Sequence, residues 1–147
     1  MRPAVRVRAH VEEKKGNPMK VTASAISLTV VDVNASSAFV VEHFGFREKM
    51  SADGFVALLR EDVGMELVFL RRGLEVLPEA YRNQCAAGVI VAFVVHGLED
   101  EERRLRGEGV AITLALREEP WGERLFQVTD PNGIIYQLVD WPAGVRA

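Results

Sequence analysis

Few side chains in this chain of 147 residues have types and spacings suited to chemistry. Cys85 is the single cysteine, so it can form neither an intramolecular disulfide nor a cysteine-based zinc site alone. No histidine neighbours Cys85 in the sequence, and we interpret it as a small buried side chain rather than a nucleophile. The histidines His10, His43 and His96 lack the spacing of joint metal ligands, so we expect them to be solvated or to cap helices.

Glu66 is the acidic residue best placed for chemistry, because it lies in the apolar run MELVF that is typical of a strand. A carboxylate that points into an apolar cleft is costly unless it is paired or protonated. Three interpretations stay open. Glu66 contacts a cationic or hydrogen-bonding group of a ligand, acts as a catalytic base, or pairs internally with an arginine or with Gln137.

Composition excludes several classes of protein. The chain has 18 Lys and Arg against 21 Asp and Glu, so it lacks the basic balance typical of nucleic-acid-binding proteins. The longest apolar run, residues 86–95, is too short to cross a bilayer. The N-terminus has no apolar segment typical of a secretory signal. We therefore expect a cytoplasmic protein that binds neither nucleic acid nor membrane.

Residues 1–20 differ from the rest of the chain, because they include six basic and only two acidic residues. Residues 5–11 alternate between apolar and polar side chains, a pattern typical of a strand. Two interpretations stay open for this segment. It is either a basic N-terminal extension ahead of Met19 or an extra edge strand lent to a partner subunit.

The sequence contains an internal repeat, whose matching strands begin at Ala25 and Ile90, 65 residues apart. Each copy has an apolar strand, a polar turn, a helix that ends near a glycine, and three further strands. The predicted helices span 36–44, with Asn34 or Ser36 as the N-cap, and 99–106. The strands predicted after the helices span 47–50, 55–60 and 65–70, then 111–116, 125–129 and 134–141.

This repeat predicts an α+β fold of two βαβββ modules. We divide the chain into an N-terminal extension (1–20), a first module (21–73), a linker (74–87) and a second module (88–142). One four-stranded half-sheet with one helix leaves a sheet face bare. We therefore expect the modules to form a curved eight-stranded mixed sheet around a cleft, with the helices on its convex face.

Side chains alternate between the two faces of a strand, which sorts the residues by face. The face expected under the helices carries Ile26, Leu28, Met65, Leu67, Phe69, Phe93, Tyr136 and Leu138. The concave face is the expected ligand site. The predicted ligand-binding residues are Ser27, Thr29, Glu66, Val68, Ala92, Trp121, Phe126 and Gln137. For Trp121 two interpretations stay open: stacking on a flat ligand, or packing on a neighbouring strand.

Two motifs resemble those of the vicinal oxygen chelate superfamily. The run VVDVNASSAFVVEHFGF is similar to the family's strand–helix opening, with matches at Asp32, Ser36, Phe39, Gly45 and Phe46. Trp121-Gly122 and the run DPNGIIYQLV resemble the family's closing signature. The resemblance covers about residues 21–142 and implies the paired βαβββ fold, usually as a homodimer. The family includes glyoxalases, extradiol dioxygenases, epimerases, fosfomycin-type resistance enzymes and metal-free bleomycin-type binding proteins.

Enzymes of this family hold a divalent metal with a ligand, usually His, on the first strand of each module and Glu on each last strand. The corresponding positions here are Ala25, Glu66, Ile90 and Gln137. Alanine and isoleucine have no donor atoms, and one carboxylate with one amide cannot replace a His/Glu set for zinc, nickel or iron. We therefore expect a member without the family metal and without another cofactor.

Three functions are compatible with this resemblance. The first is a metal-free homodimer that binds or sequesters a hydrophobic or aromatic small molecule in the concave cleft, as bleomycin-type resistance proteins do. The second is a lyase- or dioxygenase-type enzyme that uses Glu66 or a non-standard metal site. The third is a scaffold or regulator whose cleft is filled by its own side chains. The lost ligands and the apolar cleft floor favour a binding protein over an enzyme.

Overall fold

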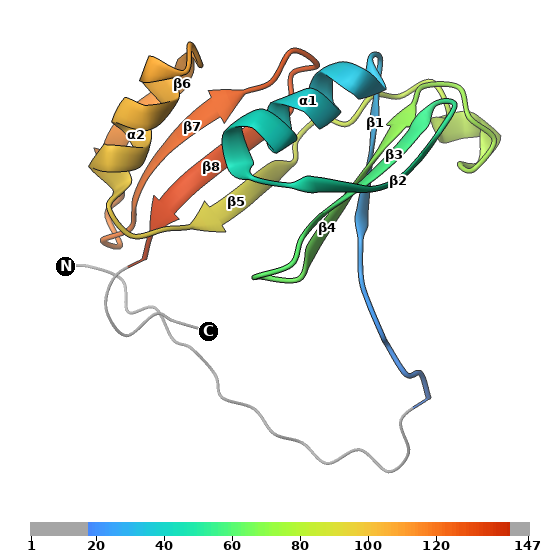
Figure 1. The fold of residues 1–147 in the computed structure, drawn as a ribbon, viewed down its shortest axis with the longest axis horizontal. Coiled ribbons are helices and arrows are strands. Elements are labelled where there is room, and N and C mark those ends of the chain that lie inside the picture. The colour runs from blue at the N-terminus through green and yellow to red at the C-terminus, as the bar shows by residue number, and fades with distance from the viewer. Residues whose placement is uncertain (1–17, 142–147) are drawn as a thin grey trace.

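The computed structural model describes residues 18–141, which form two βαβββ modules (Figure 1). Module 1 contains β1 (Ile26–Val30), α1 (Val33–Phe44), β2 (Arg47–Ala52), β3 (Phe55–Arg60) and β4 (Met65–Arg71). Module 2 contains β5 (Ile90–Val94), α2 (Leu98–Gly107), β6 (Ile112–Glu118), β7 (Arg124–Thr129) and β8 (Ile135–Asp140). Between them lies a linker with a short 3₁₀ helix, η1 (Glu79–Tyr81).

Two sequence-based expectations fall on the N-terminal segment. The strand predicted over residues 5–11 and the side chain of His10 lie outside the described residues. Within residues 18–141, neither helix has the length and the apolar composition needed to cross a bilayer.

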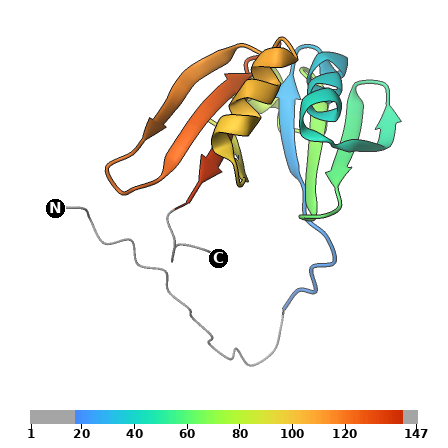
Figure 2. The ribbon, with the colours of Figure 1, turned by 60° about the vertical axis from the view of Figure 1, so that its left-hand side comes forward.

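The eight strands form two four-stranded sheets of the same topology. Sheet 1 has the strand order β1-β4-β3-β2 and sheet 2 has the order β5-β8-β7-β6. The α+β class, the two modules and the eight strands are confirmed. The predicted continuous eight-stranded sheet is not formed within residues 18–141, because no strand of one sheet pairs with a strand of the other (Figure 2).

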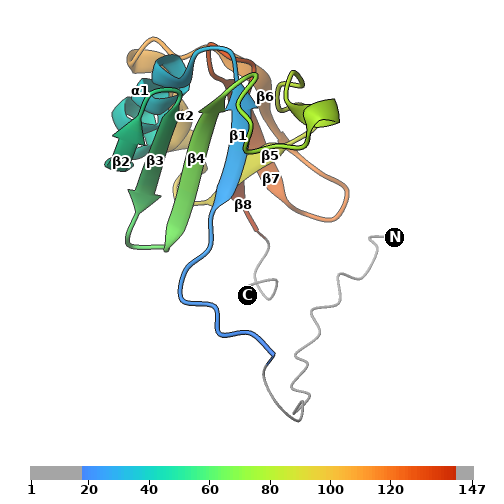
Figure 3. The same cartoon turned by 90° about the vertical axis from the view of Figure 1, so that its right-hand side faces the viewer.

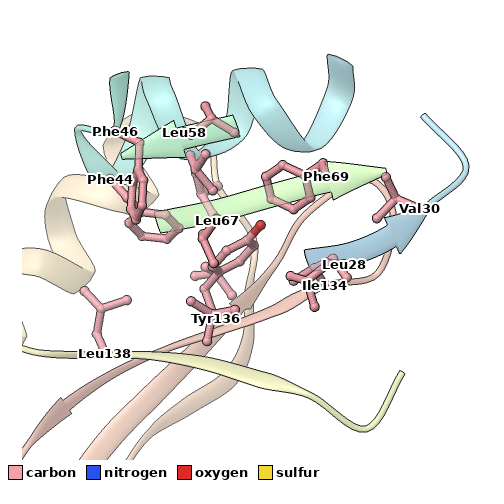
Figure 4. Close-up of a cluster of buried hydrophobic side chains, with 14 of the residues drawn as sticks. Leu28, Val30, Phe44, Phe46, Leu58, Leu67, Phe69, Ile134, Tyr136 and Leu138 are labelled. Carbon is pink, nitrogen blue, oxygen red and sulfur yellow. The ribbon is translucent and has the colours of Figure 1, made fainter. Parts of the chain in front are cut away.

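The two sheets remain separate because each turns an apolar inner face toward a shared hydrophobic core (Figure 4). Aromatic rings of α1 cross the boundary between the modules: Phe44 lies 5.0 Å from Phe93, and Phe39 lies 5.4 Å from Tyr136, between ring centroids. Burial of this apolar surface is the main force that holds the modules together.

Most of the side chains predicted to pack under the helices do so. Those buried in the core are Leu28, Leu67, Phe69, Tyr136 and Leu138, and those partly buried against it are Met65 and Phe93. Ile26 is an exception, with 58% of its surface exposed. It is the first residue of β1 and does not belong to the shared core.

Helix α1 begins three residues earlier than predicted. Its N-cap is Asp32, whose side chain accepts a hydrogen bond from the Ala35 amide, rather than Asn34 or Ser36. Gly45 ends the helix as predicted, with a φ of 71° that glycine adopts without strain. Because Asp32 caps the helix, the Ser36 side chain is available for a contact outside α1.

Ser36 makes this contact within a buried polar cluster at the turn between β7 and β8. The Ser36 hydroxyl donates to Oδ2 of Asp130 at 2.6 Å, and the Tyr136 hydroxyl donates to the same oxygen at 3.0 Å. Oδ1 of Asp130 accepts the amides of Asn132 and Ile134. Burial, followed by the negative charge of Asp130, raises the pKa of the Tyr136 phenol, which therefore remains a donor.

Asn132 completes the cluster by binding the start of α1. Its side-chain nitrogen donates to the Asp32 carbonyl at 2.6 Å and to the Ser36 hydroxyl at 2.7 Å. Its side-chain oxygen accepts the Asp32 amide at 3.0 Å. The turn of module 2 is thus attached to the helix start of module 1 by side chains whose hydrogen bonds are satisfied.

Replacing Ser36 with alanine should destabilise the protein. Ser36→Ala removes one donor to a buried carboxylate and one acceptor for Asn132, which is expected to cost about 1–3 kcal/mol. Urea denaturation followed by circular dichroism measures this as a lower midpoint. Ser37→Ala is the control, because the Ser37 hydroxyl bonds only the Val33 carbonyl of its own helix and should change stability by less than about 0.5 kcal/mol. Equal effects of the two substitutions would contradict the role given to Ser36.

Candidate functional site

The outer face of sheet 1, opposite the shared core, brings together the candidate residues of module 1. Figure 3 looks onto this sheet with the helices behind it. The register of the parallel pair β1–β4 sets Ser27 beside Val68 and Thr29 beside Leu70, with Glu66 next along β4. Val68 and Thr29 are buried, whereas Ser27 is exposed. The expected neighbours therefore form one surface, at the edge of which Glu66 lies.

Glu66 is paired with a lysine that the sequence did not indicate. Nζ of Lys49 lies 3.2 Å from Oε1 and 3.4 Å from Oε2 of Glu66. Lys49 occupies a β-bulge in β2, where the register to β3 shifts between Glu48 and Met50, and a bulge changes the direction of a side chain. Of the three interpretations of Glu66, internal pairing is the one that the contacts favour. The partner is neither an arginine nor Gln137.

The linker covers part of this outer face. Leu74 and Phe55 pack over Ala57, Val68 and Leu70, which form a second, smaller apolar cluster. The linker also runs beside the free edge of β1, where the Ala86 amide donates to the Thr29 carbonyl at 2.7 Å. The chain thus fills some of its own predicted ligand surface with Leu74, whereas Ser27 stays exposed.

The outer face of sheet 2 carries a polar pair at the other candidate position. Nε2 of Gln127 donates to Oε1 of Gln137 at 2.9 Å. The register sets Ala92 beside Gln137, and Ile90 beside Ile135. The residue of β5 that neighbours Gln137 is therefore Ala92 rather than Ile90. Neither Ala92 nor Ile90 has a side-chain atom that could bind a metal.

Two predicted aromatic contacts have different surroundings. Trp121 lies in the turn between β6 and β7 and is 43% exposed. Phe126 is fully buried in the shared core, opposite Leu138 in the adjacent strand. The prediction that Phe126 lines the concave face is therefore wrong, because its side chain lies on the inner side of β7.

The residues at the four family metal positions do not fit a divalent metal. Only Glu66 and Gln137 carry oxygen donors, and both bind other side chains of the chain, Lys49 and Gln127. Across residues 18–141, no group of three or more His, Cys, Asp and Glu side chains is arranged to hold a metal ion. The donor set, one carboxylate beside an ammonium and one amide, is too weak for zinc, nickel or iron.

Two further side chains differ from their predicted environments. Cys85 is exposed in the linker rather than buried. His43 is neither solvated nor a cap: it is buried near the end of α1, and its Nδ1 lies 2.8 Å from Oε1 of Glu108, which follows α2. The sequence signal for this contact was weak, since the two residues are 65 apart and belong to different modules.

His43 lies at the wall of a pocket of about 670 Å³ between the modules. The end of α1, the β3–β4 turn, β5, α2 and β8 contribute to its lining, which includes Phe44, Met65, Phe93 and Leu138. Neither Glu66 nor Gln137 lines this pocket. Of the predicted ligand-binding residues, Ala92 alone lines this pocket. Nothing else in the sequence indicates the pocket, because its lining depends on how the two modules pack.

Comparisons with known proteins agree with this architecture. The structure is similar to a glyoxalase/bleomycin resistance protein/dioxygenase from Nocardioides, with a TM-score of 0.72, 19% identity and coverage of 88% of this chain and 89% of that chain. It is also similar to TioX from Micromonospora sp. ML1, with a TM-score of 0.63, 21% identity and coverage of 82% of this chain and 98% of that chain. A third similar structure is lactoylglutathione lyase from Agrobacterium tumefaciens, with a TM-score of 0.65, 15% identity and coverage of 84% of this chain and 96% of that chain. A comparison with curated protein sequences finds no significant match.

At these identities the solved structures support the fold alone. A family model adds evidence from the sequence, since that of the Glyoxalase/Bleomycin resistance protein/Dioxygenase superfamily matches residues 22–138. The match includes both strand–helix openings, the DPNG turn and β8 as far as Leu138. The chain therefore belongs to the glyoxalase/bleomycin resistance protein/dioxygenase superfamily.

Proposed function

We propose that this protein binds or sequesters a hydrophobic or aromatic small molecule at its outer sheet faces, without a metal and as a homodimer. The observation that supports this most is the chemistry at the family metal positions. An internal ion pair and an amide pair replace the metal ligands, and a small apolar cluster lies on the same face of sheet 1 as the ion pair. A surface of this kind offers an apolar contact area with a few polar groups to orient a ligand.

The shape of the single chain supports the proposed homodimer. Each outer face lies on the far side of its sheet from the shared core, so a cleft walled by two outer faces needs a second copy. Ile90 and Val94, on the outer face of β5, are 51% and 53% exposed. A second copy would bury these apolar side chains and place another sheet opposite Ser27 and Glu66.

The enzyme alternative gains less support from the geometry. A carboxylate that acts as a base needs an oxygen free to face the substrate. Both oxygens of Glu66 lie within 3.4 Å of the Lys49 ammonium. A turnover that disappears in Glu66→Gln would nevertheless favour the enzyme over the binding protein.

Divalent metals should not stabilise the protein. Because the donor set is weak, the melting temperature in excess Zn²⁺, Ni²⁺ or Mn²⁺ should equal that in EDTA. A specific metal at one hundred times its Kd would add about 2.7 kcal/mol, which differential scanning fluorimetry detects. A stoichiometric, EDTA-reversible rise in melting temperature would show that the four positions were mapped wrongly.

Ile90→Asp should dissociate the dimer. The substitution places a charge on an apolar surface that the proposal buries, and burying an unpaired charge is costly. Sedimentation equilibrium should give twice the chain mass for the wild type and a shift toward the chain mass for the variant. Val76→Asp is the control, since Val76 is 66% exposed in the linker. A wild type that sediments as a monomer would refute the homodimer.

The ligand surface is tested with Nile red, an uncharged fluorescent aromatic probe. Ser27→Arg places a long cation over the exposed end of the outer face of sheet 1 and should weaken saturable probe binding by about tenfold or more, a loss of about 1.4 kcal/mol. Ser51→Arg, an exposed substitution on β2, should bind as the wild type does. If Ser27→Arg binds the probe with unchanged affinity, the ligand does not occupy this face.

A further inference from the structure

The pocket between the modules is a second candidate binding site. Its lining includes Ala92 and Val94 of β5 but none of the candidate residues on the outer face of sheet 1. Its volume of about 670 Å³ lies within the range of about 300–1,000 Å³ typical of small-molecule sites. The apolar part of its lining comes from both modules and includes Phe44, Met65, Phe93, Val95 and Leu138. An apolar wall of this kind fits the flat body of an aromatic molecule.

One polar group in this pocket has a fixed orientation. Nδ1 of His43 lies 2.8 Å from Oε1 of Glu108, whose other oxygen accepts from Arg104 at 2.9 Å. The hydrogen bonds from His43 and Arg104 hold the pKa of the Glu108 carboxyl below its usual value, so it stays an anionic acceptor. The proton on Nδ1 of His43 therefore points toward Glu108, and in the neutral form of the ring Nε2 is an acceptor.

Nε2 of His43 has no hydrogen-bond partner among the described residues. The Glu42 carboxylate is 3.9 Å away, beyond hydrogen-bond distance. Every fully buried side-chain nitrogen and oxygen within residues 18–141 has a partner. Nε2 is therefore not fully buried, although the His43 side chain is only 9% exposed. It belongs to a residue that lines the pocket.

The charged groups at the rim do not favour an anionic ligand. The Arg60 guanidinium donates to Asp62 and to the Phe44 carbonyl. The Arg104 guanidinium donates to Glu101, Glu108 and the His43 carbonyl. Both cations are neutralised by these contacts, and Glu42 adds a negative charge beside His43.

We propose that the pocket between the modules binds an uncharged aromatic molecule that donates a hydroxyl or N–H hydrogen bond to Nε2 of His43. Phenols and indole-type heterocycles are the corresponding chemical class. The ring lies against Phe44 and Phe93, and the donor reaches the imidazole. This site does not depend on the outer face of sheet 1 or on the function proposed for it, although it shares Val94 with the surface that the proposed dimer buries.

Naphthol and naphthalene test the proposal, because they share an aromatic body and differ in the donor. Calorimetry on the wild type should give an affinity for naphthol at least about tenfold higher than that for naphthalene, the value of one net hydrogen bond. In proton–nitrogen NMR of the imidazoles, naphthol should shift Nε2 of His43 and leave His10 and His96 unchanged. Equal affinities, or an unshifted His43, would overturn the proposal.

Two variants separate this site from the outer faces. His43→Asn retains a side-chain amide that can donate to Glu108 and removes the Nε2 acceptor, so naphthol should bind it no better than naphthalene. Ser27→Arg should bind naphthol as the wild type does, because Ser27 lies on the outer face of sheet 1. The opposite result, loss of binding in Ser27→Arg and none in His43→Asn, would place naphthol on the outer face and overturn the assignment to this pocket.

Discussion

One buried carboxylate, that of Asp130, determines how the two modules meet. It accepts Ser36 from α1, Tyr136 from β8 and two amides of its own turn. A buried carboxylate is tolerated only when its oxygens are satisfied, so these donors hold the start of α1 against sheet 2. This attachment brings the inner faces of both sheets to one core. The contact between His43 and Glu108 joins the modules again at the other end of α1.

The substitutions at the family metal positions follow a consistent physical pattern. A metal site concentrates negative and neutral donors around a cation. Here the retained carboxylate of Glu66 has its cation supplied by Lys49, which a β-bulge directs onto the outer face. Gln137 is satisfied by Gln127 in the same way. The chain therefore compensates for its lost ligands with its own side chains, and its surface suits ligands that need no metal.

The modules and their family could be predicted from the sequence because those signals are local. Strand alternation, the glycine at position 45 and the DPNG turn act over a few residues. The N-cap was placed wrongly because Ser36 serves a contact 94 residues away with Asp130. The contact of Lys49 with Glu66 could not be predicted, because a bulge has no clear sequence signal. The pocket at His43 could not be predicted either, because it depends on how the modules pack. The sequence allows the interpretation that the chain fills its own cleft, but it does not indicate that Leu74 is the residue that covers the outer face.

The linker has a consequence for solubility. An edge strand with unpaired backbone groups can recruit strands from other chains and start aggregation. The Ala86 amide occupies the Thr29 carbonyl at the free edge of β1, so the linker covers that edge at Thr29 while it joins the modules. The linker must therefore be long enough both to join the modules and to reach the edge of β1. A shortened linker that still spans the gap between the modules would leave β1 open to pairing with neighbouring chains.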